Sequence, residues 1–442
     1  MIRQTIVFAL VLLSVLAAAE QPPSSAVKAE MAAQQPAIEE HLRVEDAVRF
    51  ALEHNPSVKS AAYVVDAQRH KVPQAKSLPD PTVSVGWMGN SRPFSVMEGD
   101  PSSYRSVSAM QMLPFPGKLR LKGEMASKEV EVAQADYEGV RRRIASEVKA
   151  AYYEYFYFDK ALETTRRNKD LLVKLSKISE ARYRVGKAMQ PDVLKSQTEI
   201  SMLLQRLTML EQQRETAQAR LNMLMGREPE SPLPPAADVA PLEVALDLEQ
   251  LYQLAQRTDP MLARETRMLE RNQIAVAMAK KEYRPDLSIG YMYQQRPMMM
   301  DMKGFTFTVN VPIFYKSKQR EAVRQAQQEV MAAQQSRDSR INELRFEVKQ
   351  QYLAAKAAKS LLDLYSKAVV PQSSLALESS MSAYQVGSSD FLTMLSNFST
   401  LLNYETEYYR QVADYQIALA NIETLIGVDL TNVVIAGEAV KQ

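Results

Sequence analysis

Cysteine is absent from the 442 residues, which excludes disulfide bonds, thiolate metal sites and thiol catalysis. Histidine is almost absent: no two of His41, His54 and His70 have the i, i+4 spacing with which one helix presents two metal ligands. Lysine and arginine (54) nearly balance aspartate and glutamate (52), so charge gives no reason to expect a nucleic-acid partner. We therefore expect a protein that is not an enzyme, with no catalytic residues and no cofactor.

Glycine is scarce as well, at 13 residues, whereas Ala, Gln, Leu, Glu and Lys are abundant, and this composition favours long helices. Long apolar runs are also missing. The run at 6–16 is shorter than the roughly 20 residues of a membrane-spanning helix. Because it follows Arg3 and precedes three alanines at 17–19, we interpret 1–19 as a secretory signal peptide, with a membrane anchor as the alternative.

The chain contains an internal duplication. Asn55-Pro56 recurs as Asp259-Pro260, and Pro81 before an alternating segment recurs as Pro285; both separations are 204 residues (259 − 55 and 285 − 81). YRVG at 183–186 recurs as YQVG at 384–387. Solenoid repeats usually have periods of about 20–50 residues, so this long period indicates two equivalent halves.

Proline and glycine positions predict the boundaries of the segments. We expect a signal peptide (1–19), an extended polar segment (20–43), a first half (44–226), a Pro-rich linker (227–246), a second half (247–427) and a C-terminal tail (428–442).

Each half is predicted to contain a helix, two strands, a long helix and a further helix. In the first half the strands are expected at 81–90 and 104–113, and in the second at 285–295 and 304–313. The long helices are expected at 117–185 and 316–384, the second bent at Pro371. Their apolar residues alternate in steps of 4 and 3, as in a coiled coil, at Ile144, Val148, Ala151, Tyr155, Phe158, Leu162 and Thr165 in the first half.

The short segments alternate between apolar and small polar residues. In the last one, Phe305, Phe307, Val309, Val311 and Ile313 alternate with Thr306, Thr308 and Asn310. This pattern is typical of transmembrane β-strands, although an antiparallel sheet packed on helices would show the same period. Four strands are fewer than the about eight of the smallest membrane barrels, so membrane strands would require several chains to share one barrel. Two chains would give an eight-stranded barrel whose lumen is nearly filled by side chains. Three chains would give a twelve-stranded barrel that leaves a channel.

These motifs together resemble the TolC-type outer-membrane efflux channels, over nearly the whole chain from Val44 to Gly427. The resemblance rests on the duplication, ALEHNP at 51–56, PDP at 79–81, LPFPGKL at 113–119, its counterpart VPIFYKSK at 311–318, and the two YxVG turns. It implies a mainly α fold: an internally duplicated barrel of long helices, with four strands per chain contributing to a trimeric 12-stranded transmembrane β-barrel. The PFPGKL element is most similar to the heavy-metal and multidrug branch.

The resemblance also implies function and partners. A homotrimer would sit in the lipid of the outer membrane, with a long periplasmic portion that meets a periplasmic adaptor and an inner-membrane pump. It would be a passive exit duct for the substrates that the pump delivers. A duct for type I protein secretion and a periplasmic coiled-coil structural or adaptor protein are the alternatives, and the sequence does not identify the substrate.

For the gate, the resemblance implies Gly186 and Gly387 as turn or hinge residues and Asp192 and Asp390 as acidic residues that narrow the pore. The second half carries Thr393 and Ser396 where some relatives have a pair of aspartates, so only Asp390 remains there. Helix capping is the alternative role for both aspartates. Four methionines, Met298, Met299, Met300 and Met302, are weak candidates for a soft-metal site, because methionine is plentiful in this chain (23 residues).

Overall fold

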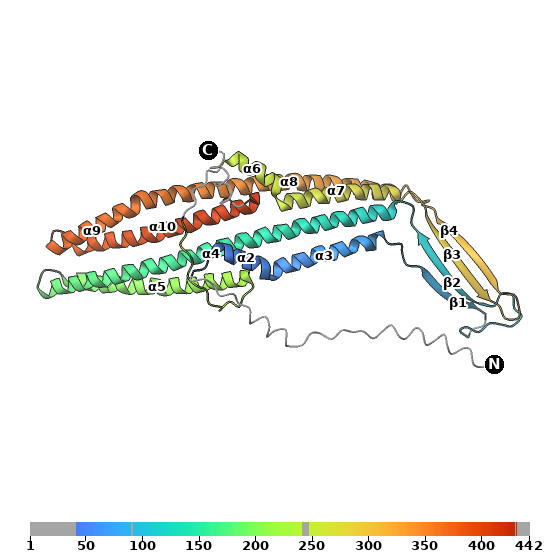
Figure 1. Cartoon of the computed structure of the whole chain (residues 1–442), viewed down its shortest axis with the longest axis horizontal. Coiled ribbons are helices and arrows are strands. Elements are labelled where there is room, and N and C mark those ends of the chain that lie inside the picture. The colour runs from blue at the N-terminus through green and yellow to red at the C-terminus, as the bar shows by residue number, and fades with distance from the viewer. Residues whose placement is uncertain (1–40, 90–91, 241–246, 429, 431–442) are drawn as a thin grey trace. The chain divides into compact units, whose positions relative to one another are not determined.

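The computed structural model describes residues 41–89, 92–240, 247–428 and 430. All of these except His41 belong to one unit, Leu42–Gln442. The predicted signal peptide lies outside the described residues. The first half contains α2 (Val44–His54), α3 (Pro56–Lys76), β1 (Thr82–Met88), β2 (Tyr104–Leu113), α4 (Lys118–Arg184) and α5 (Gln190–Met225). The second half contains α6 (Leu248–Thr258), α7 (Pro260–Lys281), β3 (Asp286–Gln295), β4 (Met302–Asn310), α8 (Gln319–Leu364), a π-helical segment η1 (Tyr365–Val369), α9 (Val370–Val386) and α10 (Phe391–Ile426). The order of the first half is thus repeated (Figure 1).

The repeated Asn-Pro and Asp-Pro pairs start equivalent helices. The side chain of Asn55 accepts a hydrogen bond from the backbone N–H of Ser57 at 2.8 Å, and Asp259 accepts one from Leu262 at 2.8 Å. The following proline occupies the first helical position, where its missing N–H costs nothing. Both short helices therefore end where the next one is capped.

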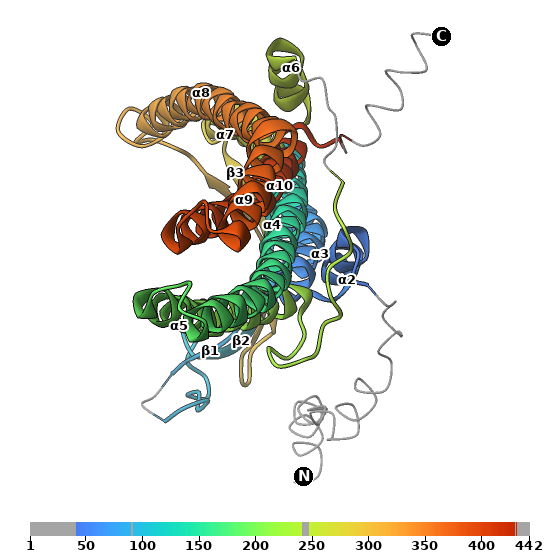
Figure 2. The ribbon, with the colours of Figure 1, turned by 90° about the vertical axis from the view of Figure 1, so that its left-hand side faces the viewer.

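The 67-residue helix α4 is the main packing element, and at about 1.5 Å per residue it is about 100 Å long. It packs against α3, α5, α7 and α10. Viewed along the helices, α8, α10, α4 and α5 follow one arc (Figure 2). The predicted coiled-coil positions of α4 are buried, with the exception of the half-buried Phe158: Ile144, Val148, Ala151, Tyr155, Leu162 and Thr165. In the part of the chain that the structure describes, no helix is both long and apolar enough to cross a membrane.

The second long helix is not continuous, because η1 separates α8 from α9. Pro371 lies in the first turn of α9, directly after the π-helical segment. Its ring lacks an N–H and clashes with the carbonyl oxygen four residues earlier, which belongs to Lys367 of η1. The corresponding stretch of α4 has no proline and stays regular.

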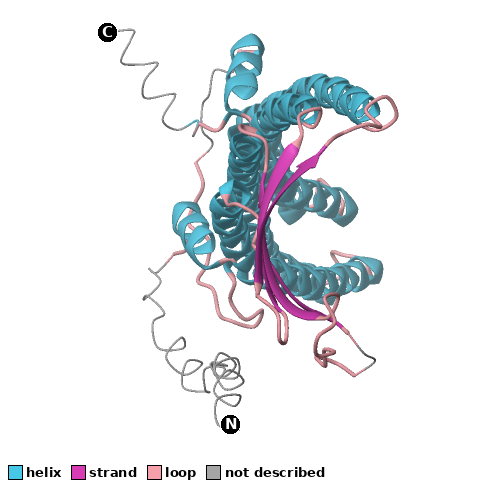
Figure 3. Ribbon diagram, turned by 90° about the vertical axis from the view of Figure 1, so that its right-hand side faces the viewer, coloured by secondary structure: helices cyan, strands magenta, loops and turns pink. Residues whose placement is uncertain are grey.

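The four strands form one antiparallel sheet in the order β1-β2-β3-β4 (Figure 3). In the register, Ser84 pairs with Ser108, Ser108 with Met292, and Met292 with Gly304. All even-numbered strand residues therefore share one face and all odd-numbered residues the other. The prediction that the last strand runs to Ile313 is wrong: β4 ends at Asn310, just before Pro312, which cannot donate a ladder hydrogen bond.

Candidate functional site

The odd-numbered face of the sheet is apolar except near the strand ends, where it carries Arg105, Gln111, Gln295 and Lys303, and it is uncovered within the described chain. Phe305 and Phe307, for example, expose 73% and 75% of their surface. The same face carries Val83, Val85, Trp87, Val107, Leu287, Ile289, Tyr291 and Val309, all exposed. An apolar surface of this extent marks a site of contact with lipid or with another protein.

The even-numbered face has the opposite character. Apart from methionine and the end residues Tyr104 and Asp286, it carries small or polar residues: Thr82, Ser84, Gly86, Ser106, Ser108, Ser288, Gly290, Gln294, Gly304, Thr306, Thr308 and Asn310. A sheet with one apolar and one polar face suits a boundary between lipid and water. The sheet is curved in Figure 3.

A buried lysine fixes the junction between the sheet and the long helices. Lys118, the first residue of α4, is only 3% exposed, and its ammonium group donates to Asp286 at 2.9 Å and to Glu282 at 3.1 Å. The other carboxylate oxygen of Asp286 accepts from the backbone N–H of Phe115 at 2.7 Å. The start of β3 is therefore tied to the start of α4, so the two halves are joined where strands become helices.

At the opposite end of the long helices, two helical hairpins form adjacent tips (Figure 1). Gly186 ends the first helix with φ +70° and Gly387 the second with φ +84°. In each tip the residue after the glycine donates to a carbonyl five residues earlier: Lys187 to Arg182 at 2.8 Å and Ser388 to Ala383 at 2.9 Å. This left-handed helix ending favours glycine, which explains the two YxVG motifs.

Arg182 links the two tips. Its guanidinium donates to the backbone carbonyls of Tyr384 and Gln385, the latter at 2.8 Å, and lies 4.8 Å from the centre of the Tyr384 ring. These carbonyls belong to the last turn of α9, where the helix dipole favours a cation. Sequence reasoning missed this residue. The signal was the broken symmetry of the duplication, because Ala383 occupies the equivalent position in the second half.

An apolar core from four helices supports this link. Tyr384 is buried and its ring meets that of Phe391 edge-on at 5.7 Å. Around them lie residues of α4, α5, α9 and α10, namely Leu172, Leu175, Leu203, Leu377, Met394, Leu395, Phe398, Leu401 and Leu402. The two tips are thus packed together within one chain.

Each predicted gate aspartate lies at the start of a tip helix. Asp390 is exposed and caps α10 by accepting from the backbone N–H of Thr393 at 2.8 Å. The hydroxyl and N–H groups of Thr393 lower the pKa of Asp390, so its carboxylate stays charged. Asp192, in the first turn of α5, accepts from the N–H of Met189 at 3.4 Å. Each carboxylate bonds within its own hairpin, which agrees with capping and leaves the charge of Asp390 open to solvent.

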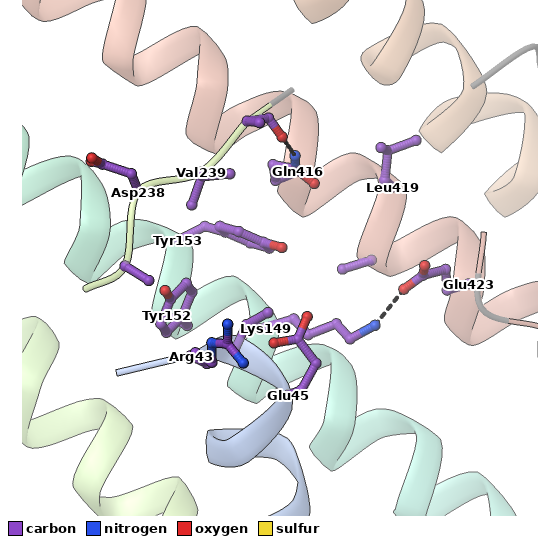
Figure 4. A pocket seen from close by; sticks show the side chains of 14 residues that line it. Arg43, Glu45, Lys149, Tyr152, Tyr153, Asp238, Val239, Gln416, Leu419 and Glu423 are labelled. Atoms are coloured by element: carbon purple, nitrogen blue, oxygen red, sulfur yellow. Dashed lines mark hydrogen bonds and ion pairs between the residues drawn. The ribbon is translucent and has the colours of Figure 1, made fainter. Parts of the chain in front are cut away.

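A cavity of about 520 Å³ lies partway along α4, between α2, α10 and residues 237–240 (Figure 4). Lys149 and Glu423 form an ion pair at 2.5 Å on its wall. The hydroxyl of Tyr152 donates to the carbonyl of Leu42 at 2.9 Å, and burial raises the pKa of Tyr152. Among the described residues, no group of three His, Cys, Asp or Glu side chains could hold a metal ion. The hydrogen bonds and the ion pair on the cavity walls connect the chain before α2 and the chain after α5 to α4 and α10.

The methionines of the β3–β4 connection are exposed, Met298 by 84% and Met300 by 87%. Met298 has a φ of +61°. The sequence predicted that Met302 also lies in this loop. That prediction is wrong, because Met302 is the first residue of β4.

A curved sheet with one lipid-compatible face, joined to long helices that end in adjacent hairpin tips, is the architecture of an outer-membrane channel subunit. The family model for outer membrane efflux proteins matches residues 47–227 and 251–428, so the chain belongs to the outer membrane efflux protein family. Its function is that of an outer-membrane efflux duct with a long periplasmic helical part, as expected from the sequence.

Solved structures of outer-membrane channels have the same fold. CusC is 16% identical and matches with a TM-score of 0.75, covering 93% of this chain and 99% of CusC. The CmeC channel of Campylobacter jejuni (14%, TM-score 0.75) covers 90% of this chain and 89% of its own. VceC of Vibrio cholerae (17%, TM-score 0.73) covers 88% and 96%. A comparison with curated protein sequences returned no match.

Proposed function

We propose that three copies of this chain close one 12-stranded barrel and that this homotrimer is the exit duct of a tripartite efflux pump. The observation that carries the proposal is the apolar odd-numbered face of a sheet whose outer strands, β1 and β4, each pair on one side only in the described chain. Open strand edges in lipid would leave backbone groups unpaired at several kcal/mol each. Three chains remove every edge and leave a water-filled lumen lined by the polar face.

The tips are the proposed docking site for the periplasmic adaptor and the inner-membrane pump. Both tips expose apolar side chains next to their turns: Val185 and Met189 in the first, Val386 and Leu392 in the second. Val185 and Val386 occupy equivalent places in the two hairpins, and exposed apolar residues beside both turns suit a partner that contacts both. The duct itself performs no chemistry and the pump supplies the energy. The signal peptide at 1–19 would direct export, and metal ions or organic drugs are the proposed substrates.

Matched lysine substitutions test the proposal. A strain without the gene should lose tolerance to a panel of drugs or metals, and the wild-type gene should restore it. Val107→Lys places a charge on the lipid face near the middle of β2, at a cost of about 2–4 kcal/mol, and should prevent trimer assembly and complementation. Ser108→Lys, one residue further on the lumen face, should assemble and complement. Equal behaviour of the two variants, or unchanged tolerance of the deletion strain with its pump expressed, would contradict the proposal.

We further propose that Asp390 contributes one ring of negative charge to the closed tip, with Asp192 as the candidate in the first half. Asp390→Asn removes the charge and keeps a good helix cap, whereas Asp390→Ala removes both. If the charge lines the pore, both variants should reduce block by divalent cations in planar bilayers. If Asp390 only caps α10, Asp390→Asn should behave as wild type, and that result would leave no pore role.

A further inference from the structure

Methionine is confined to one face of the sheet. The five methionines of the strands are all even-numbered and therefore lie on the small, polar face: Met88, Met110, Met112, Met292 and Met302. The apolar odd-numbered face, which carries Val, Leu, Ile, Phe and Tyr, has no methionine in these strands. A thioether used only as an apolar filler would fit that face equally well. Its restriction to the polar face requires another reason.

Four of the five form a continuous diagonal across three strands. Met110 and Met112 are next-but-one neighbours on β2, about 7 Å apart at about 3.4 Å per residue. Met110 pairs with Gly290, two residues from Met292, and Met292 pairs with Gly304, two residues from Met302. Such diagonal neighbours are about 7–8 Å apart, which long side chains can bridge. The diagonal begins at the end of β2 that leads into α4 and finishes at Met302, the first residue of β4. The loop that carries Met298 and Met300 lies directly before Met302 in the sequence.

Three of the side chains on this diagonal, Met110, Met112 and Met302, are exposed, and Met292 is half-buried. Met110 and Met292 each have a glycine as one cross-strand neighbour and a small polar residue, Thr82 or Ser108, as the other, so no large side chain stands opposite them. The terminal methyl of Met292 lies 4.0 Å from where a Cβ would stand on Gly304, so its side chain extends over β4, the strand that carries Met302. The sulfur of Met292 also accepts a hydrogen bond from Gln294 at 3.5 Å, so its lone pairs face polar groups.

We propose that Met112, Met110, Met292 and Met302 form a binding track for a soft monovalent cation, Cu(I) or Ag(I). Thioethers are soft, uncharged ligands that select such ions over Mg²⁺ or Ca²⁺. No cysteine exists in the chain to trap the ion on a thiolate. The placement of the track on the lumen wall rests on the proposed function, because the barrel encloses the even-numbered face, whereas the binding itself needs only the sheet.

Silver binding to the full-length protein tests the site. The protein is purified through an affinity tag that contains no histidine. We expect Ag(I) to bind in equilibrium dialysis and its X-ray absorption spectrum to show sulfur neighbours, which can come only from methionine. The variant Met110→Leu/Met112→Leu/Met292→Leu/Met302→Leu keeps side-chain volume and should bind at least tenfold more weakly, without sulfur neighbours. A matched control changes four exposed helix methionines to leucine and should bind as wild type: Met202, Met209, Met223 and Met331.

A second variant, Met298→Leu/Met299→Leu/Met300→Leu, separates the track from the loop and should retain the bound silver. Absence of sulfur neighbours in the wild type, or wild-type binding by the track variant, would overturn the proposal, as would loss of binding in the loop variant alone. Single-channel conductance of the same preparations reports the duct independently. A track variant that conducts normally but binds silver unchanged overturns only the metal site.

Discussion

Replacing Arg182 with alanine is expected to weaken the link between the two tips and so to favour opening of the proposed gate. Its guanidinium holds two carbonyls of α9 and stacks on Tyr384, and hydrogen bonds to a charged group contribute about 1.5–3 kcal/mol each. Since about 1.4 kcal/mol corresponds to a tenfold change in an equilibrium, the open population should rise at least about tenfold. Single-channel recordings of the purified protein in planar bilayers should show a correspondingly higher open probability.

Arg184 provides the matched control. It is the last residue of α4, two residues after Arg182, is exposed, and pairs with Glu180 at 3.9 Å. Arg184→Ala should therefore leave the open probability unchanged. Arg182→Lys keeps the charge without the planar fork that reaches two carbonyls, so it should fall between wild type and Arg182→Ala. Equal open probability in Arg182→Ala and Arg184→Ala would show that the link does not hold the tip closed.

The local features of the fold could be predicted from the sequence because each depends on neighbouring residues. Alternation fixed the two faces of the strands, the spacing from Ile144 to Thr165 identified the buried stripe of α4, and the YxVG glycines marked the left-handed helix ends. The π-helical segment is an intermediate case. Pro371 indicated a disturbance in the helix, but how the turn before it would accommodate the ring depends on its packing.

The long-range contacts could not be predicted. Arg182 and Tyr384 are 202 residues apart, and the pattern around either residue is that of an ordinary helix end. The methionine diagonal likewise depends on the β2–β3 register, which places Met110 opposite Gly290. Alternation shows which face a methionine occupies, but only the strand pairing, including that of β2 with β3 from different halves, shows which methionines are neighbours.

Breaking the buried ion pair between Asp259 and Arg340 is expected to destabilise the second half strongly. Asp259 is 5% exposed and Arg340 15%, and the guanidinium meets both carboxylate oxygens, at 3.0 and 3.3 Å. Arg340→Met leaves the carboxylate buried without its partner, which should cost about 3–5 kcal/mol. Thermal unfolding of the purified protein, followed by circular dichroism, should show a clearly lower midpoint.

The first half supplies the design of the rescue variant. At the position equivalent to Asp259, Asn55 caps its helix without a charge and donates to the carbonyl of Leu224 at 2.7 Å. Adding Asp259→Asn to Arg340→Met removes the unpaired charge and keeps a cap, so most of the lost stability should return. Arg324→Met, which breaks an exposed pair with Glu321 on the same helix, should cost less than about 1 kcal/mol. If the double variant is no more stable than Arg340→Met alone, the loss comes from helix packing and not from the buried charge.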